Sequence, residues 1–200
     1  MSNPIDFYFD FSSPYGYFAA VEIDKLAAQH GRDVNWHPIL LGPIFKALGT
    51  NSLVNIPVKG EYSRHDMERT ARFHNIFYKA PSHFPIGTQV AARATLWVQQ
   101  TQPSKAVELI KTLYSAYFTE DIDISVVDNV LRIAADLGID RNALQAALES
   151  PELKDQLRQS TEAAGQAGVF GSPFMIVDGE QFWGFDRFPQ LEALLKNGKI

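Results

Sequence analysis

The chain of 200 residues contains no cysteine. Thiol–disulfide exchange needs two cysteine thiols, and sulfur-ligated metal sites need cysteine thiolates, so the sequence excludes both kinds of chemistry. If the protein carries out sulfur chemistry, the thiol must therefore come from a bound molecule.

Membrane and nucleic-acid signals are also missing. No apolar run approaches the ~18 residues that span a bilayer, and the N-terminus lacks the basic and apolar stretches of a secretory signal peptide. The formal net charge is −5 and no block of five or more Lys or Arg occurs, which argues against a nucleic-acid surface. We therefore expect a cytoplasmic protein without membrane or nucleic-acid partners.

Histidines are present, but not in a metal-binding pattern. His65, His74 and His83 are spaced nine apart, and on one helix this spacing puts neighbouring side chains on opposite faces. The H-x-H and HExxH spacings of metal sites do not occur. We predict no metal site.

The start of the chain has a β-α-β pattern. Apolar and aromatic residues alternate over 5–10, which predicts a buried strand. A helix is expected from Pro14 to about Gln29, because proline suits the first turn of a helix. A second strand is expected over 34–41. With 46% hydrophobic residues, the chain is ample for a packed core.

The middle of the chain is predicted to be helical. A Gly-, Pro- and Asn-rich stretch begins at residue 42 and leads into a charged, helical segment around 61–77. Four helices follow without an interrupting strand pattern, at about 86–101, 103–118, 125–137 and 140–149. This block therefore has the character of an all-helical insertion.

The C-terminal part returns to mixed structure. Ser150 and Pro151 favour the start of a helix that runs to about Ala164. Strands at 174–177 and 181–184 are joined by the hairpin signal Asp178-Gly179, and a last helix covers about 187–196. The order β-α-β … α-β-β-α predicts an α/β fold: a thioredoxin-like domain (1–41 plus 160–200) with a large helical insertion (42–159).

In such a fold, Ser13-Pro14-Tyr15-Gly16 occupies the place where a thiol–disulfide oxidoreductase carries Cys-x-x-Cys. A hydroxyl delivered to a helix N-terminus can hold a sulfur anion, since the free N–H groups and the helix dipole favour negative charge. Ser13 also suits the role of helix N-cap, and the two roles are compatible. Ser12, one residue earlier, is the alternative for contact with the sulfur.

Four motifs together resemble the 2-hydroxychromene-2-carboxylate isomerases. The motifs are Phe9-Asp10-Phe11-Ser12-Ser13-Pro14-Tyr15, Trp36-His37-Pro38-Ile39-Leu40-Leu41-Gly42, Phe170-Gly171-Ser172-Pro173 and Phe182-Trp183-Gly184-Phe185-Asp186-Arg187. That family is similar to kappa-class glutathione transferases and, more distantly, to DsbA-like disulfide oxidoreductases with an inserted helical domain. The resemblance implies glutathione as cofactor, a role in aromatic catabolism and a homodimer.

The resemblance also implies site residues. Ser13 corresponds to the serine that contacts the glutathione sulfur, and Asp186, next to Phe185, to the carboxylate that holds the γ-glutamyl ammonium. Ser172 and Pro173 correspond to a cis-proline loop whose backbone pairs with the tripeptide like an added strand. Asn51 corresponds to a glutathione-binding asparagine in the Gly-rich stretch before Pro57, and Lys59 to a lysine that follows Pro57.

Structural roles compete with some of these assignments. Asp186 also suits the N-cap of the last helix, and Asp10 is expected to close the strand–helix turn through bonds to backbone N–H groups. Trp36, Trp97 and Trp183 are expected in the core, although Trp183 and Phe170 are alternatives for the wall of a pocket for a flat aromatic substrate.

The implied activity is glutathione-dependent cis–trans isomerisation. Reversible thiolate addition would open 2-hydroxychromene-2-carboxylate to trans-o-hydroxybenzylidenepyruvate and return glutathione unchanged. Lys59 or Arg64 is the candidate for binding the small aromatic carboxylate substrate, and Tyr15 or Tyr62 for its phenolic oxygen. A kappa-type glutathione transferase or peroxidase, and a non-catalytic thioredoxin-fold binding module, are the alternative functions.

Overall fold

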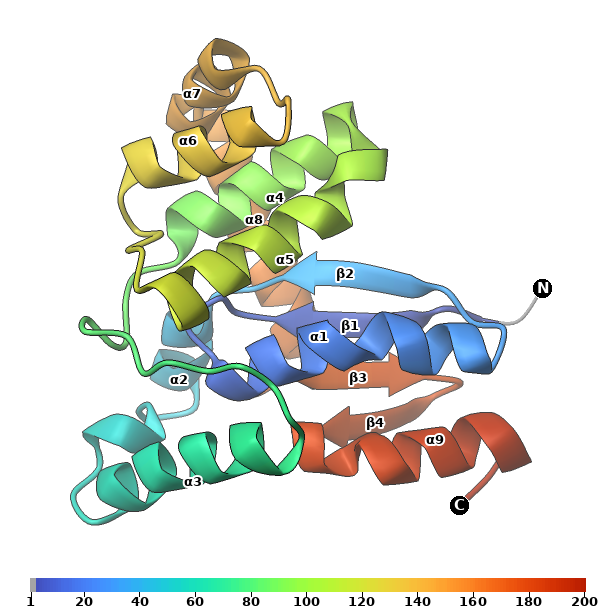
Figure 1. Cartoon of the computed structure of the whole chain (residues 1–200). Coiled ribbons are helices and arrows are strands. Elements are labelled where there is room, and N and C mark those ends of the chain that lie inside the picture. Colours follow the sequence, from blue (N-terminus) through green and yellow to red (C-terminus); the bar gives the residue numbers. More distant parts are fainter. Residues whose placement is uncertain (1–2) are drawn as a thin grey trace.

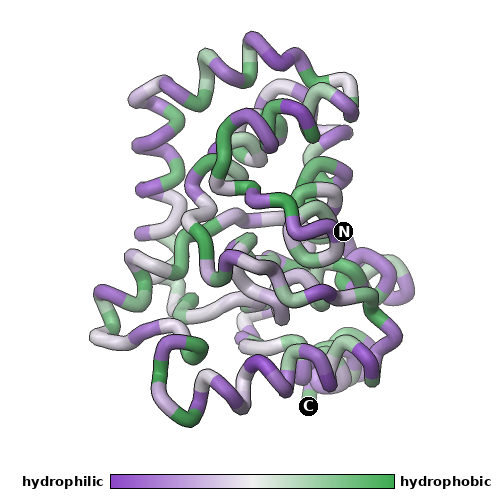
Figure 2. Tube along the Cα trace, turned by 60° about the vertical axis from the view of Figure 1, so that its left-hand side comes forward, coloured by the Kyte–Doolittle hydropathy of each residue, from purple (hydrophilic) through white to green (hydrophobic). Residues whose placement is uncertain are grey.

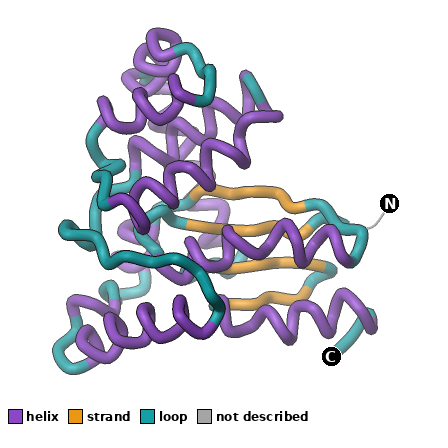
Figure 3. Tube along the Cα trace, viewed as in Figure 1, coloured by secondary structure: helices purple, strands orange, loops and turns teal. Residues whose placement is uncertain are grey.

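The computed structural model describes residues 3–200, and its centre is one four-stranded sheet with the order β2-β1-β3-β4 (Figures 1 and 3). β1 (Ile5–Phe9) pairs in parallel with β2 (Val34–Pro38) and antiparallel with β3 (Phe174–Val177). β3 pairs antiparallel with β4 (Glu180–Trp183) through the predicted Asp178-Gly179 turn. Segments from the two ends of the chain therefore form the sheet.

Each face of the sheet is covered by helices. Phe7 and Met175 are opposite each other in the register and pack on one face with α1 (Pro14–Gln29) and α9 (Phe188–Asn197). Phe174 points to the other face and packs with residues of α2 (Leu41–Ala47) and α8 (Pro151–Gln166). The period-2 alternation of the strands thus gives two apolar layers.

Between β2 and α8, the part of the chain that the structure describes contains helices and no strand. Besides α2 these are a 3-10 helix η1 (Leu53–Asn55), α3 (Lys59–Phe73), α4 (Gln89–Thr101), α5 (Pro103–Glu120), α6 (Val127–Asp136) and α7 (Arg141–Glu149). In Figure 1, α4 to α7 lie together beyond β2, whereas α3 lies apart from them on the other side of α1. The helices alternate between hydrophilic and hydrophobic segments along the trace (Figure 2), as amphipathic helices do.

The helical block and the sheet part share one core. Tyr17 of α1 stacks on the fully buried Phe118 of α5, with ring centroids 5.4 Å apart. Tyr114 of α5 also contacts Phe9, the last residue of β1, and Phe11 in the turn that follows. α5 is therefore the element that joins the helical block to the strand–helix turn after β1.

The thioredoxin-like fold with helical additions is confirmed, but one strand is shorter than predicted. β2 ends at Pro38, and Leu41 begins α2 instead of closing the strand. The backbone N–H of Leu41 donates to the Asp10 carboxylate, which satisfies one of the free N–H groups at the start of α2. The domain limits 1–41 plus 160–200 and 42–159 remain a prediction, and the limit at 159/160 falls within α8.

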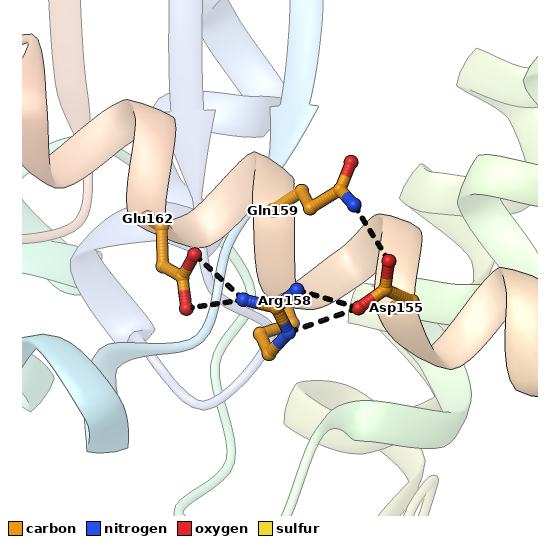
Figure 4. Close-up of polar contacts among 4 residues, drawn as sticks. All are labelled: Asp155, Arg158, Gln159 and Glu162. Carbon is orange, nitrogen blue, oxygen red and sulfur yellow. Dashed lines mark hydrogen bonds and ion pairs between the residues drawn. The ribbon is translucent and has the colours of Figure 1, made fainter.

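The solvent-facing side of α8 carries a network of charged side chains (Figure 4). Arg158 donates to Asp155 and Glu162, and Gln159 donates to Asp155. These side chains are one helical turn apart and exposed, so the network contributes little to stability. The buried residues Leu153, Leu157, Thr161 and Ala164 attach the opposite side of α8 to the protein.

Candidate active site

A cavity of about 1260 Å³ opens where the turn after β1 meets the loop before β3 and the helices α2 and α3. Most of the residues predicted for the site contribute to its wall. They are Ser12, Ser13, Tyr15, Asn51, Tyr62, Ser172, Pro173, Phe185 and Asp186. The structure thus brings together residues that are more than 170 positions apart in the sequence.

Ser13 is held at the N-terminus of α1. Its Oγ accepts a hydrogen bond from the Gly16 backbone N–H at 3.0 Å, so Ser13 is the N-cap. The same Oγ donates to the backbone carbonyl of Ser172 at 2.7 Å. The Tyr15 backbone N–H, next along the helix end, has no partner among the described residues. This end of α1 therefore presents a hydroxyl and a free N–H at the cavity.

Ser12 is oriented by Asp10. The Ser12 backbone N–H and Oγ both donate to Asp10 Oδ1, at 2.8 and 2.9 Å, which confirms the predicted turn-closing role of Asp10. Thr88 Oγ1 donates to the same oxygen at 2.8 Å, and Leu41 N–H donates to Oδ2 at 2.7 Å. Burial raises the pKa of Asp10 above its ordinary value, although these four hydrogen bonds act in the opposite direction.

The backbone of Asp10 connects Ser13 to the loop before β3. Asp10 N–H donates to Ser172 Oγ at 3.0 Å, and Asp10 O accepts from Ser13 N–H at 2.9 Å. Tyr114 of α5 donates its hydroxyl to Asp10 O at 3.0 Å. Burial and the nearby Asp10 charge raise the pKa of Tyr114 well above its usual range, so this donor keeps its proton. Sequence reasoning missed Tyr114 and Thr88, because no local pattern links them to Asp10.

The loop before β3 has the predicted form. The Ser172–Pro173 peptide bond is cis, and Pro173 O accepts from Gly184 N–H at 3.0 Å. Trp183 was expected first as a core residue and is not one, because its side chain is 52% exposed at the cavity. Its ring packs edge-on against Phe170, with centroids 4.9 Å apart, which confirms the alternative that these two residues wall the cavity.

Asp186 lies in a 3-10 helix, η2 (Phe185–Arg187), and lines the cavity. It does not cap the last helix: the N-cap of α9 is Arg187, which makes no side-chain capping bond. The turn that leads to Asp186 favours glycine at 184, because its φ of +108° is a conformation that residues with a Cβ rarely adopt. The prediction that Asp186 caps the last helix is therefore wrong. Its exposed carboxylate lines the cavity instead.

One wall of the cavity is a polar cluster on α3. Tyr15 OH donates to Asp66 Oδ2 at 2.5 Å, and Arg69 donates to Asp66 Oδ1 and, at 3.1 Å, to Tyr62 OH. Burial and the Asp66 bond raise the pKa of Tyr15 far above its usual range, so its hydroxyl stays protonated. Asp66 and Arg69 were not among the predicted site residues, although the 62-66-69 spacing puts them on one helix face with Tyr62.

Lys59 and Arg64, the two predicted cations, are exposed and are not among the residues that line the cavity. The Lys and Arg residues that line it, among residues 3–200, are Arg69 and Arg187. Within the same part of the chain, no group of three or more His, Cys, Asp or Glu is placed to hold a metal ion. No helix there is long and apolar enough to cross a membrane.

The polar groups that line the cavity fit a thiol-containing peptide. Ser13 Oγ and the Tyr15 N–H suit a sulfur anion, because both are donors at a helix N-terminus. The backbone of the loop at Ser172 suits main-chain pairing, and Asp186 suits an ammonium group. These three binding functions lie in the wall of one cavity, as binding of a tripeptide such as glutathione requires.

Fold and site together define a thioredoxin-like protein that lacks redox thiols, and the DSBA-like thioredoxin domain family matches residues 4–196. A 2-hydroxychromene-2-carboxylate isomerase of Sphingobium xenophagum is 32% identical over 98% of this chain and 99% of its own length. The chain belongs to the 2-hydroxychromene-2-carboxylate isomerase family, and the predicted resemblance is confirmed.

Other comparisons agree with this membership. A solved structure of a 2-hydroxychromene-2-carboxylate isomerase superimposes with a TM-score of 0.86 at 27% identity, covering 96% of this chain and 94% of that one. The human glutathione S-transferase kappa 1 is 27% identical over 98% of this chain and 92% of its own length. The prediction of an isomerase is thus confirmed at the level of the enzyme class.

Proposed function

We propose that this protein is a glutathione-dependent isomerase that opens 2-hydroxychromene-2-carboxylate to trans-o-hydroxybenzylidenepyruvate. The observation that carries the proposal is the position of Ser13: a hydroxyl at a helix N-terminus, bonded to the cis-proline loop, in a chain without cysteine. A sulfur nucleophile at this site must come from a ligand.

Several residues of this chain would hold glutathione. Asp186 would bind the γ-glutamyl ammonium beside Phe185, and the Ser172–Pro173 backbone would pair with the cysteinyl unit. Asn51 lines the cavity and would contact the peptide beyond that unit. When bound, glutathione would supply a thiolate that adds to the substrate double bond and, after rotation about the resulting single bond, is eliminated again, so that the C–S bond breaks, the double bond re-forms and glutathione is not consumed.

Ser13 would stabilise that negative charge. An ordinary thiol has a pKa near ~8.5, and each unit by which the site lowers it corresponds to about 1.4 kcal/mol. Ser13 Oγ–H donates to Ser172 O in the described structure, so it can turn its donor to the sulfur while Gly16 N–H keeps the oxygen in place. The Tyr15 N–H adds a second donor at the same helix end.

Turnover with and without glutathione tests the proposal. Isomerisation of 2-hydroxychromene-2-carboxylate would be followed by ultraviolet absorbance while free thiol is measured in the same sample. Glutathione-dependent isomerisation with constant thiol is the expected result. No effect of glutathione on any readout would overturn the site assignment.

The similarity to kappa-class transferases favours a second candidate function. A transferase or peroxidase would use the same site, but glutathione would be incorporated into the product or oxidised. Loss of thiol during turnover would support this alternative. A non-catalytic binding module, the third alternative, would show no turnover that Ser13→Ala could change.

The assembly, the cellular location and the metabolic role of this protein stay predictions. A homodimer is expected and is checked by light scattering, and a cytoplasmic location by fractionation. The role in aromatic catabolism depends on the substrate test above. Lys59 and Arg64 stay candidates for the substrate carboxylate, although neither lines the cavity.

A further inference from the structure

The wall of the cavity contains an arginine whose binding capacity is only partly used. Arg69 Nη2 donates to Asp66 and to Tyr62 OH. Its Nη1 and Nε have no hydrogen-bond partner within residues 3–200. The guanidinium carbon also lies 5.6 Å from the centroid of the Tyr62 ring, which limits its freedom. A planar, oriented guanidinium with free N–H groups is suited to bind a carboxylate in a fork geometry.

Arg69 is coupled to the end of α1 that carries Ser13. Asp66 accepts from Arg69 through one oxygen and from Tyr15 OH through the other. The Asp66 pKa reflects this: burial raises it, but the bonds from Tyr15 and Arg69 outweigh burial and lower it. Tyr15 is two residues after Ser13, so Asp66 fixes the cation relative to the place where sulfur chemistry is proposed.

The other arginine of the wall, Arg187, lies at a different part of the cavity. Arg187 Nη2 lies 3.3 Å from Asp186 Oδ2, at the proposed γ-glutamyl subsite. The wall of the same cavity carries apolar side chains. Those that line the cavity include Phe45, Met67, Phe73, Phe84 and Ile86. An oriented cation in a cavity that also has apolar and aromatic walls fits an aromatic carboxylate.

We propose that Arg69 binds the carboxylate of the aromatic substrate, held in position by Asp66 and Tyr62. The assignment rests on the proposed function, because it names the group that recognises the substrate beside the glutathione site. It replaces Lys59 and Arg64 as the first candidate for this role. Glutathione carries two carboxylates of its own, so the test must distinguish binding of the substrate carboxylate by Arg69 from binding of a glutathione carboxylate.

Equilibrium binding separates them without turnover. The protein is first titrated with S-methylglutathione, an unreactive thioether, and the saturated protein is then titrated calorimetrically with 2-hydroxycinnamate or with its neutral amide. For Arg69→Gln we expect at least tenfold weaker binding of 2-hydroxycinnamate, because a charge-assisted bidentate contact is lost. Binding of the amide and of S-methylglutathione should change less than twofold.

Arg72→Gln is the matched control. Arg72 is on the same helix, exposed and 3.7 Å from Glu68, and it does not line the cavity. This variant should bind all three ligands like the unaltered protein. Equal weakening of the acid and the amide in Arg69→Gln would mean a packing role, and weakening of S-methylglutathione would mean that Arg69 binds glutathione. Either result overturns the proposal.

The same titrations distinguish this proposal from the function on which it rests. If the unaltered protein does not bind S-methylglutathione, the glutathione-dependent function fails, and the acid and amide are compared without it. If the unaltered protein binds acid and amide equally, the Arg69 assignment fails even though the glutathione site stands. Arg69→Lys should keep part of the preference for the acid, since it retains the charge but not the fork.

Discussion

At the scale of single residues, Ser13 combines two functions in one hydroxyl. Ser13→Ala removes the N-cap bond to Gly16 and the donor proposed for the sulfur. We expect about 1 kcal/mol lower stability from the lost cap. We also expect a thiol pKa of bound glutathione about one unit higher, equivalent to ~1.4 kcal/mol. Thiolate absorbance during a pH titration measures the pKa, and urea unfolding measures the stability.

Ser12→Ala is the control for this prediction. Its hydroxyl donates to Asp10 and caps no helix, so the thiol pKa should stay unchanged. A larger shift in Ser12→Ala than in Ser13→Ala would assign the sulfur contact to Ser12 instead.

Asp10 gives a prediction on pH dependence. Burial raises the pKa of Asp10, so the folded protein binds the carboxyl proton more tightly than the unfolded chain does. The contribution of Asp10 to the free energy of unfolding therefore falls as the pH rises above the ordinary aspartate pKa of about 3.9. Asp10→Asn should cost about 1–3 kcal/mol, because the amide NH₂ would face the Leu41 N–H donor or leave other donors unpaired. The difference in free energy of unfolding between the two proteins should be greatest near the ordinary aspartate pKa and should become smaller at higher pH.

Urea unfolding of both proteins between pH 4 and 8 checks this prediction. A difference that grows with pH would show that the four hydrogen bonds outweigh burial and that the folded protein favours the ionised carboxylate. In that case Thr88→Val, which removes only one donor to Asp10, should also lower the free energy of unfolding more at high pH than at low pH, by a smaller amount than Asp10→Asn.

At the scale of elements, the first turn of α1 is packed against two other segments at Gly16. A Cβ at this position would lie 2.8 Å from Ser172 Oγ and 2.8 Å from Tyr114 OH. Gly16→Ala should therefore displace the cis-proline loop or α5 and cost about 1–3 kcal/mol, despite the higher helix propensity of alanine. S-methylglutathione binding should weaken in parallel, which calorimetry measures.

Gly165→Ala provides the opposite case within α8. Its Cβ would have no atom within 4 Å, so the gain in helix propensity should stabilise the protein slightly and leave ligand binding unchanged. If Gly16→Ala and Gly165→Ala had equal effects on stability and on S-methylglutathione binding, close packing at Gly16 would not be important for the site.

At the scale of the whole molecule, α5 links the helical block to the sheet part. Phe118 is fully buried and contacts Tyr17 of α1 as well as its neighbours on α5. Phe118→Ala should cost about 3–5 kcal/mol. Because the core is shared, we expect one transition for the whole chain, with coincident circular dichroism and tryptophan fluorescence curves.

Two separate transitions would contradict this expectation. They would show that the predicted limits 1–41 plus 160–200 and 42–159 mark independently folding units. In that case, Phe118→Ala should shift one transition more than the other, which identifies the part that Phe118 stabilises.

The local elements of this fold followed from the sequence, since hydrophobic period, capping residues and turn signals act over a few positions. α1 begins at Pro14 and α8 at Pro151 as predicted, and the Asp178-Gly179 turn joins β3 to β4. α2 was missed, because its start depends on a bond from Leu41 to Asp10, 31 residues earlier. A contact at that distance leaves no periodic signal.

The sequence by itself determined the absence of a protein thiol, the place of Ser13 before a helix, and the strand and helix order of a thioredoxin-like fold. Only the tertiary structure decided which side chains share the cavity with Ser13. Ser172 reaches Asp10 across 162 positions and Asp66 reaches Tyr15 across 51. The physical reason is that helix and strand formation depend on neighbouring residues, whereas the cavity wall depends on how distant segments pack around one core.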